Sequence, residues 1–308
     1  MRTQLAQWNL GHLACNGTLQ PRYYITCAGR TDGGGAQIQA IFSTMLYAHC
    51  ARLVYQHTPI KSVEHNTNRD EDWADKWERA FSPGYAELQS KAIDLDGMRL
   101  VPAESMRFEL PRPAPTEPTL LVASECHWYA DAHPGFYSLI QPRLRQKYAR
   151  NARPSVPRGD RLTVAVHIRR GDVSERDTER FTPNATVVNQ IEQLHRMLAS
   201  LPHEIHVFSE GSEDDFGPIP DRAVMHLNGD VFECFHALIH AEIFVMAKSS
   251  FSYTAALLSR GIVIYNPFWH APLQQWIVAD ERGCLPESWF QTALSRELLL
   301  RSARQQRI

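Results

Sequence analysis

The residues best suited to chemistry in this sequence lie within positions 161–172, RLTVAVHIRRGD. Residues 162–168 are mostly apolar and rich in β-branched side chains, which is typical of a strand buried on both faces. The run ends at the charged residues Arg169, Arg170 and Asp172. Ligands of open α/β sheets bind at this end of the strands, and two adjacent guanidiniums offer forked donors that fit phosphate oxygens. We interpret the segment as a pyrophosphate-handling loop. The alternative is a surface Arg–Asp salt bridge that closes a turn.

A polar loop at 248–252, KSSFS, is the second candidate. It follows a predicted strand at 243–247 and precedes a predicted helix at 253–260, so its hydroxyls and amides would face an anion favoured by the helix dipole. The serines would alternatively cap that helix, and this alternative stays open. Combined with the arginines, such a loop would hold a diphosphate without a divalent ion, because the positive charge is already in place.

The third candidate is the glycine-rich loop 28–36, AGRTDGGGA, which opens a helical pattern. Successive glycines let a backbone approach a ligand closely. The glycines concerned are Gly33, Gly34 and Gly35. The loop is neither GxGxxG nor a Walker loop, and a mobile surface turn is the alternative. Arg30 and Asp32 inside the loop favour a functional interpretation.

The elements around these loops predict an α/β fold. In the first half, strands are expected at 23–27, 52–55 and 119–123, and helices at 70–81 and 136–150. In the second half, strands at 162–168, 204–208, 243–247 and 262–265 alternate with helices at 184–198, 231–242 and 253–260, the first capped by Asn184. This alternation implies a parallel, doubly wound sheet. A last amphipathic helix is expected at 287–301.

The Pro/Gly/Arg-rich segment 151–159 is interpreted as a linker. The expected domains are therefore 1–155, with the glycine-rich loop, and 156–308, with the other two loops. A chain of 308 residues has room for both.

Composition excludes several classes of function. Hydrophobic residues make up 44 % and charged residues 21 %, as in a soluble globular protein, and a net charge of −2 gives no bulk attraction to nucleic acid. No apolar run approaches the ~20 residues that span a bilayer. The six cysteines lack CxxC spacing, which indicates reduced thiols. We therefore expect a cytoplasmic protein without a membrane segment, although a secretory protein trimmed of an N-terminal anchor would look the same.

Three segments resemble one family. Residues 167–172, HIRRGD, resemble the HxRRxD motif of α1,2- and α1,6-fucosyltransferases, including rhizobial chitin-oligosaccharide enzymes and protein O-fucosyltransferase relatives. Residues 233–252, ECFHALIHAEIFVMAKSSFS, look like the later motif of that family, a helix, a strand and a Ser-Ser-Phe-Ser loop. The loop at 28–36 resembles its N-terminal glycine loop. The segments occur in the order of the family.

The resemblance implies a GT-B architecture, two Rossmann-like domains with a cleft between them. It also implies inverting, metal-independent transfer of fucose from GDP-fucose to a hydroxyl of a glycan or glycoprotein, with no cofactor beyond this donor. By motif position, Arg169 or Arg170 would hold the β-phosphate, supported by His167 and Asp172. Further phosphate contacts would come from the serine loop, namely Ser249, Ser250, Phe251 and Ser252.

The remaining roles depend on positions where the chain departs from the family. An acidic residue that contacts guanine in relatives is replaced by Cys234, so Glu233 or Asp230 would substitute for it. Some relatives place an acidic base five residues beyond the motif aspartate, which corresponds to Asp177, with Asp32 as a rival and Glu175 as a neighbour. A lysine that follows the motif in α1,6 enzymes is Val173 here, which leaves the linkage open.

Other interpretations remain open at this stage. A catalytically inactive relative that binds a nucleotide or glycan, or a GT-B transferase using another nucleotide sugar, would carry similar motifs. Two DxD patterns, at 70–72 and 94–96, match the metal–nucleotide motif of another transferase fold, and the latter also fits a turn. His236 and His240, four residues apart on a helix, could form a zinc face with Glu233. The aromatic residues of 268–270, FWH, would either stack on a sugar or base or pack in the core.

Overall fold

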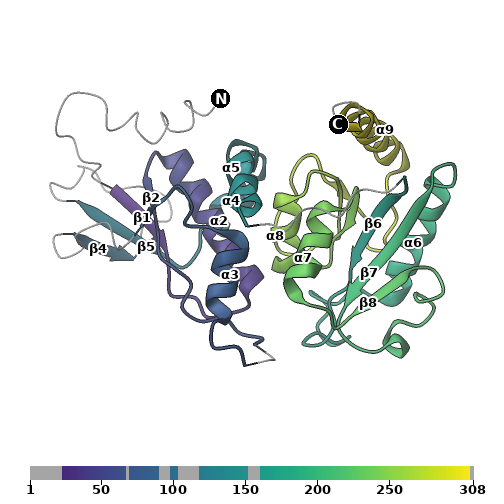
Figure 1. Cartoon of the computed structure of the whole chain (residues 1–308), viewed down its shortest axis with the longest axis horizontal. Helices are drawn as coiled ribbons and strands as arrows, with labels where there is room; N and C mark the ends of the chain where they lie inside the picture. Colours follow the sequence, from purple (N-terminus) through teal and green to yellow (C-terminus); the bar gives the residue numbers. More distant parts are fainter. Residues whose placement is uncertain (1–22, 67–68, 90–97, 103–117, 152–159, 306–308) are drawn as a thin grey trace. The chain divides into compact units, whose positions relative to one another are not determined.

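The computed structural model of the chain describes residues 23–66, 69–89, 98–102, 118–151 and 160–305 (Figure 1). The chain divides into two compact units, Met1–Ala130 and Asp131–Ile308. This division falls earlier than the 155/156 boundary expected from the sequence; residues 152–159 of the expected linker lie outside the described residues.

Helix α5 (Tyr137–Ala149) explains why the second unit begins before the expected linker. Gln141 Nε2 donates a hydrogen bond to the Leu257 carbonyl at 3.0 Å, and the Arg145 guanidinium donates to the carbonyls of Leu258 and Ser259 at 3.0 and 2.6 Å. These acceptors belong to the C-terminal end of helix α8 (Ser250–Leu258). Since the last carbonyls of a helix lack intrahelical donors, α5 satisfies groups that would otherwise be unpaired.

The first unit contains a parallel sheet with the strand order β3-β2-β1-β5-β4. Its strands are β1 (Tyr23–Cys27), β2 (Val54–His57), β3 (Leu88–Gln89), β4 (Arg99–Pro102) and β5 (Thr119–Ala123). Helix α2 (Gly34–Ala51) follows β1, and α3 (Trp73–Phe81) follows β2, while α4 (His127–Ala132) leads into the second unit. Apolar residues of α2, such as Ile38, Phe42 and Met45, are fully buried, so this helix forms the core of the unit.

The second unit contains a six-stranded sheet with the order β11-β10-β9-β6-β7-β8, and all its paired strands are parallel. Its strands are β6 (Leu162–His167), β7 (His203–Ser209), β8 (Val224–Leu227), β9 (Ile243–Val245), β10 (Ile262–Tyr265) and β11 (Ile277–Val278). Between them lie α6 (Asn184–Met197), the short helix η5 (Glu213–Phe216), α7 (Val231–His240) and α8, and α9 (Glu287–Gln305) follows; the short helix η4 (Pro134–Phe136) precedes α5.

The order of these strands creates a defined place for a ligand. The first strand of this sheet is β6, and β7 and β8 are added on one side of it. The chain then crosses to the other side of β6, where it forms β9. This is the strand order of the Rossmann fold, in which ligands bind outside the carboxyl ends of the strands where the winding direction reverses. Here that point lies between the ends of β6 and β9. The loop after β6 and the loop before α8 both begin there.

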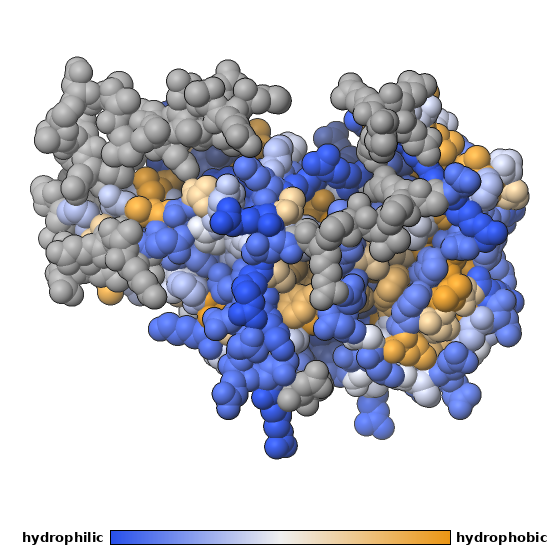
Figure 2. Space-filling model, viewed as in Figure 1, coloured by the Kyte–Doolittle hydropathy of each residue, from blue (hydrophilic) through white to orange (hydrophobic). Residues whose placement is uncertain are grey.

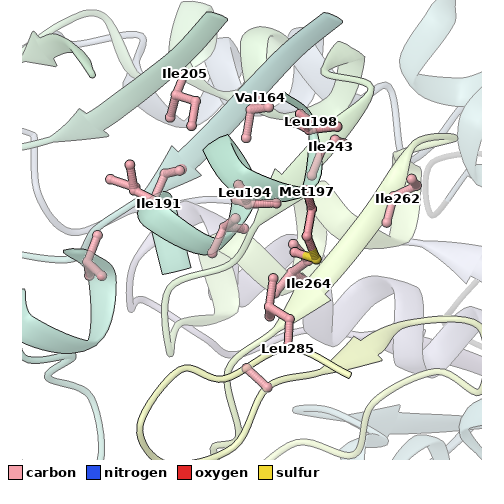
Figure 3. Packing of buried hydrophobic residues seen from close by; sticks show 14 of the residues in the cluster. Val164, Ile191, Leu194, Met197, Leu198, Ile205, Ile243, Ile262, Ile264 and Leu285 are labelled. Carbon is pink, nitrogen blue, oxygen red and sulfur yellow. The ribbon is translucent and has the colours of Figure 1, made fainter. Parts of the chain in front are cut away.

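The core of the second unit holds these two strand ends in place. Figure 3 shows Ile191, Leu194 and Met197 of α6 pointing towards the sheet, where Val164, Ile243, Ile262 and Ile264 line the facing surface. Burying each such side chain stabilises the fold by roughly 1.5–3 kcal/mol relative to leaving it exposed. Helices α7 and α8 lie on the other face of this sheet (Figure 1). The sheet is therefore covered on both faces.

The expected doubly wound α/β architecture with two Rossmann-like units is confirmed. Two details at the site differ from expectation. Helix α8 begins at Ser250 rather than 253, so the serine loop forms its first turn. Asn184 was expected to cap α6, but it is the first helical residue, and Pro183 takes the cap position without a side-chain hydrogen bond.

The surface of the described residues in Figure 2 is mostly hydrophilic, with hydrophobic residues in scattered patches. Among the helices of the described part, none is both long and apolar enough to cross a membrane.

The packing of α2 against α3 predicts the effect of a single added methyl group. A Cβ placed on Gly34 would lie 2.1 Å from Cε2 of Trp77, whose side chain is buried. Gly34→Ala should therefore lower the free energy of unfolding by about 1–3 kcal/mol, the range for overpacking a tight interior. Gly135→Ala is the matched control because its added Cβ meets nothing within 4 Å. Equal unfolding midpoints for the two variants in guanidinium chloride would contradict this packing.

Candidate functional site

A short chain of hydrogen bonds ties the end of β6 to the start of α8. Nδ1 of His167, the last residue of β6, lies 2.6 Å from Oγ of Ser252, in the first turn of α8. The same Oγ accepts the backbone N–H of Ala247 at 3.0 Å, and Ser252 is fully buried. The two loops at the reversal of the sheet are thus joined through side chains as well as through strand pairing.

The hydrogen bonds of His167 and its burial determine its charge. Burial lowers the pKa of the imidazole to about 3, with a smaller contribution from the positive charge of Arg169, so the ring is neutral at pH 7. Ser252 Oγ already accepts the Ala247 N–H, so we assign its own proton to the contact with His167 Nδ1. In this tautomer Nε2 carries the ring proton. His167 therefore offers a neutral N–H donor at the reversal point.

Arg169 follows two residues later and keeps a partly accessible guanidinium. Its Nε and Nη2 atoms donate to the two carboxylate oxygens of Asp172 at 3.1 and 2.5 Å, and 23 % of its side chain is exposed. Ion pairs near the surface contribute only about 0–1 kcal/mol. A phosphate group with more charge than a carboxylate can compete for the same fork. The pair with Asp172 pre-orients Arg169 without removing it from solvent.

Arg170 has a different environment. Its guanidinium donates to the Thr182 carbonyl at 3.0 Å, to Asn184 Oδ1 at 2.6 Å and to the Arg169 carbonyl at 2.8 Å. It lies over the Phe181 ring, 4.1 Å from the centroid, and is only 9 % exposed. Burial lowers its pKa, and the charges of Asp215 and Glu175 oppose this change. These contacts anchor the loop between β6 and α6, so of the two arginines Arg169 is the one accessible to a ligand.

The first turn of α8 supplies the other groups that suit an anion. Ser249 is its N-cap, and its side chain accepts the Ser252 N–H at 3.1 Å. The expected alternative role of the serines as caps is therefore confirmed for Ser249. Within a helix the first N–H groups have no intrahelical acceptor, so the amides of Ser250 and Phe251 remain for a ligand. The centre of the Phe251 ring lies 5.0 Å from the centre of the His167 ring and 3.8 Å from that of Phe235. This packing holds the turn in place.

Acidic residues line the neighbouring strand ends on the β7–β8 side. Asp230 is the N-cap of α7 and accepts the N–H groups of Phe232 and Glu233, both at 3.0 Å, while Glu233 is exposed in the first turn. Burial raises the pKa of the Cys234 thiol to about 12, and the nearby charges of Asp230 and Glu210 contribute. Cys234 is thus a neutral group between carboxylates.

Glu210 is a candidate that the sequence analysis missed. It directly follows β7, and a Cβ on Gly171 would lie 2.0 Å from its Oε2, so the glycine of the first loop makes room for this carboxylate. Gly171 also has a φ of +79°, which favours glycine. In Rossmann folds an acidic residue about 20 residues beyond the first loop binds ribose hydroxyls. Glu210 lies 38 residues beyond Asp172, but it likewise follows the next strand of the sheet, β7. The signal in the sequence was a glutamate two residues after the predicted strand at 204–208.

The two candidate bases lie in different units. Asp177 belongs to the loop after β6, where its carbonyl accepts the N–H groups of Arg180 and Phe181 at 2.9 and 2.7 Å. Asp32 belongs to the first unit, and its carboxylate pairs with Arg30 through two hydrogen bonds. The hydrogen bonds from this ion pair raise the pKa of Arg30.

Several hydrogen bonds hold the glycine-rich loop. Gln37 Nε2 donates to the carbonyls of Asp32 and Ser62, and the Thr31 carbonyl accepts the Glu64 N–H at 3.1 Å. Gly33 is the N-cap of α2, and the space beside Gly34 is filled by Trp77. Gly34 and Gly35 are both buried at the start of α2, and the role of the three glycines in the approach of a ligand stays a prediction.

The sites expected under the competing interpretations are placed as follows. Asp70 and Asp72 form ion pairs with Lys76, at 2.6 and 3.6 Å, and Asp72 also pairs with Arg79. Residues 94–96 lie outside the described residues. The His236 and His240 rings are 4.3 Å apart on α7, and Nδ1 of His236 lies 3.2 Å from the Tyr148 hydroxyl. In the described part of the chain, no group of three or more His, Cys, Asp or Glu side chains could hold a metal ion.

Comparisons with known proteins were made by sequence and by structure. Models of protein families give no match, and neither does a search of curated proteins. Among solved structures, a mutant of Arabidopsis thaliana FUT1 in complex with GDP is 12% identical, with 89% of this chain and 76% of that chain covered and a TM-score of 0.40.

Two further structures are similar over most of the chain. For the fucosyltransferase NodZ from Bradyrhizobium the identity is 11%, the covered shares are 78% and 94%, and the TM-score is 0.38. For the glycosyl transferase family 9 protein from Veillonella parvula the identity is 10%, the covered shares are 92% and 99%, and the TM-score is 0.43. At these values the function must be inferred from the residues of the site.

The depressed pKa of His167 predicts how stability depends on pH. The pKa is about 3 in the folded chain against 6.5 for an ordinary histidine, so the unfolded state binds more protons between these values. The stabilisation is complete above about pH 6.5 and is lost as the pH falls towards 3. Between pH ~7.5 and ~4.5 the free energy of unfolding should decrease by on the order of 2 kcal/mol through this group alone.

The measurement is chemical denaturation of the wild type and of His167→Gln at both pH values. The variant lacks the titrating ring, so its loss of stability at the lower pH should be smaller by that amount. An identical pH dependence for the two proteins would show that the fold does not hold His167 as a neutral group.

Proposed function

We propose that the chain is a glycosyltransferase that moves fucose from GDP-fucose to a hydroxyl of a glycan or glycoprotein, with inversion and without a metal ion. The observation that carries the proposal is the position of Arg169 in its HIRRGD segment. The segment resembles the HxRRxD motif, and Arg169 is a partly exposed guanidinium beside the helix start to which His167 is hydrogen-bonded.

The diphosphate would bind where three kinds of donor converge. The fork of Arg169 supplies two N–H groups and a positive charge, the first turn of α8 supplies the amides of Ser250 and Phe251, and His167 supplies a neutral N–H. Arg169 would exchange its carboxylate partner Asp172 for the phosphate. Ser249 and Ser252 would act indirectly, by fixing the turn that carries the amides.

These donors match the charge that develops during transfer. The bond between fucose C1 and the β-phosphate oxygen breaks, its electron pair remains on that oxygen, and the acceptor hydroxyl forms the new bond to C1 from the opposite face. The acceptor proton passes to a carboxylate, for which we propose Asp177, with Asp32 as the rival. Donors that are already in position stabilise the negative charge on the departing phosphate without reorganisation. The products are GDP and the fucosylated acceptor.

Guanine would be read on the β7–β8 side of the site. Its N1–H and exocyclic amino group are donors, which suit carboxylates such as those of Asp230 and Glu233. Glu210 would accept from a ribose hydroxyl at the end of β7. The replacement of a family carboxylate by Cys234 is the observation that favours the second candidate function, a GT-B transferase that uses another nucleotide sugar.

The two arginines should respond differently to substitution. Arg169→Ala should reduce turnover of GDP-fucose by about 10²–10³, the effect of deleting one donor to a developing negative charge, while the melting temperature changes little. Arg169→Lys keeps the charge but loses the fork, and should recover only part of the activity. Arg170→Ala should mainly destabilise the fold, by about 1–3 kcal/mol, because it leaves the Thr182 carbonyl and Asn184 without their donor.

The measurements are GDP release by chromatography and thermal unfolding of the same preparations. Wild-type turnover by Arg169→Ala would remove the phosphate assignment. A stable Arg170→Ala protein that has lost all turnover would instead assign the phosphate to Arg170.

The donor and the metal requirement can be tested together. In a thermal-shift panel of GDP, UDP, CMP and ADP in EDTA, GDP should raise the melting temperature most, since a ligand that binds the native state stabilises it by mass action. A larger shift with UDP would favour another nucleotide sugar. A shift that depends on manganese would contradict metal-independent binding, and binding of GDP-fucose without hydrolysis or transfer would indicate an inactive relative.

A further inference from the structure

Trp269 is a large apolar side chain held in an exposed position. It follows β10 at the C-terminal edge of the sheet, and 46% of it is exposed, while its neighbour His270 is buried. Exposed single hydrophobic residues are common and need no explanation by themselves. The loop that carries Trp269 and the residue that lies above its ring distinguish this tryptophan.

Hydrogen bonds hold the backbone of this loop both before and after Trp269. The Asp131 carboxylate lies 3.0 Å from His270 Nδ1 and accepts the Ala271 N–H at 3.0 Å. The Tyr265 hydroxyl accepts the Phe268 N–H and shares its single proton between the carbonyls of Phe268 and His270. Backbone held in this way on either side of one residue presents its side chain in a defined direction.

Arg180 reaches this indole from the other side of β9. Its guanidinium carbon lies 5.5 Å from the centre of the Trp269 ring, and Arg180 itself is exposed. Arg180 belongs to the loop after β6, and Trp269 to the loop after β10. Because β9 lies between β6 and β10 and all three strands are parallel, these loops flank the end of β9, where α8 begins.

We propose that Trp269 and Arg180 form a wall of the donor site and that the indole supports the sugar ring of the bound nucleotide sugar. This inference rests on the proposed function and adds a specificity-determining residue to it. With the acidic groups of Asp230 and Glu210 on the β7–β8 side, the base occupies that side of the diphosphate, and the sugar extends towards β10.

The chemistry of the sugar fits the wall. Fucose is a 6-deoxy sugar, so it presents a methyl group and an apolar C–H face where other hexoses carry a hydroxymethyl group. An indole offers a broad apolar surface to such a face. Arg180 holds the ring from one side by a cation–π contact and keeps a positive charge near the phosphates. The pair would favour a deoxy sugar without contacting the nucleotide.

The experiment compares GDP with GDP-fucose by titration calorimetry, without an acceptor, in the wild type, Trp269→Ala and Trp269→Phe. Trp269→Ala should weaken the binding of GDP-fucose by about tenfold, while the affinity for GDP stays unchanged. Trp269→Phe retains an aromatic face and should keep most of the GDP-fucose affinity. Arg180→Met, at an exposed position, should weaken GDP-fucose binding more than GDP binding. If circular dichroism shows that Trp269→Ala is unfolded, this second variant tests the proposed wall in its place.

The two inferences fail in different ways. Equal affinities of wild type and Trp269→Ala for GDP-fucose would overturn the wall and leave the proposed function intact. Equal weakening of GDP and GDP-fucose would also overturn it, because the tryptophan would then act on the nucleotide. A wild type that binds neither compound would overturn the proposed function, and the wall with it.

Discussion

The site depends on the hydrogen-bond chain from Ala247 through Ser252 to His167. These groups lie where the sheet reverses its winding, and a buried polar chain stabilises a structure only when each member has a partner. When the chain is complete, the end of β6 and the first turn of α8 are held at a fixed separation. We propose that a guanidinium and the first amides of a helix then face the same space, which is the requirement for binding a diphosphate by charge and dipole.

The two adjacent arginines have different environments, which under the proposed function separate a structural role from a binding role. Arg170 turns towards Phe181 and the start of α6, where backbone and amide oxygens satisfy its guanidinium. Arg169 keeps its fork near solvent, with Asp172 as an exchangeable partner. A buried cation is costly unless it is hydrogen-bonded, and the contacts of Arg170 both satisfy its guanidinium and anchor the loop that carries Arg169. Identical side chains at successive positions therefore have different roles.

The sequence predicted the elements whose signal is local. The buried strand that became β6, the alternation of strands and helices, and the position of the serine loop follow from periodicity and from polar residues at strand ends. It could not separate Arg169 from Arg170, since their partners Asn184 and Phe181 are brought near only by folding. The same holds for Gly34, whose missing side chain leaves space for Trp77 rather than for a ligand, and for Glu210, which meets Gly171 across two loops. Asn184 was expected as a cap because asparagine favours that position, but its contact with Arg170 took precedence.

The most direct test is a crystal structure of the chain with GDP bound in the presence of EDTA. We expect the diphosphate within hydrogen-bonding distance of the Arg169 guanidinium and of the Ser250 amide, with Asp172 displaced from its present contact. Diphosphate density bound elsewhere, with Arg169 still paired to Asp172 in a fully occupied complex, would contradict the idea that a positive side chain and a helix start at the reversal of the sheet take the place of a metal ion.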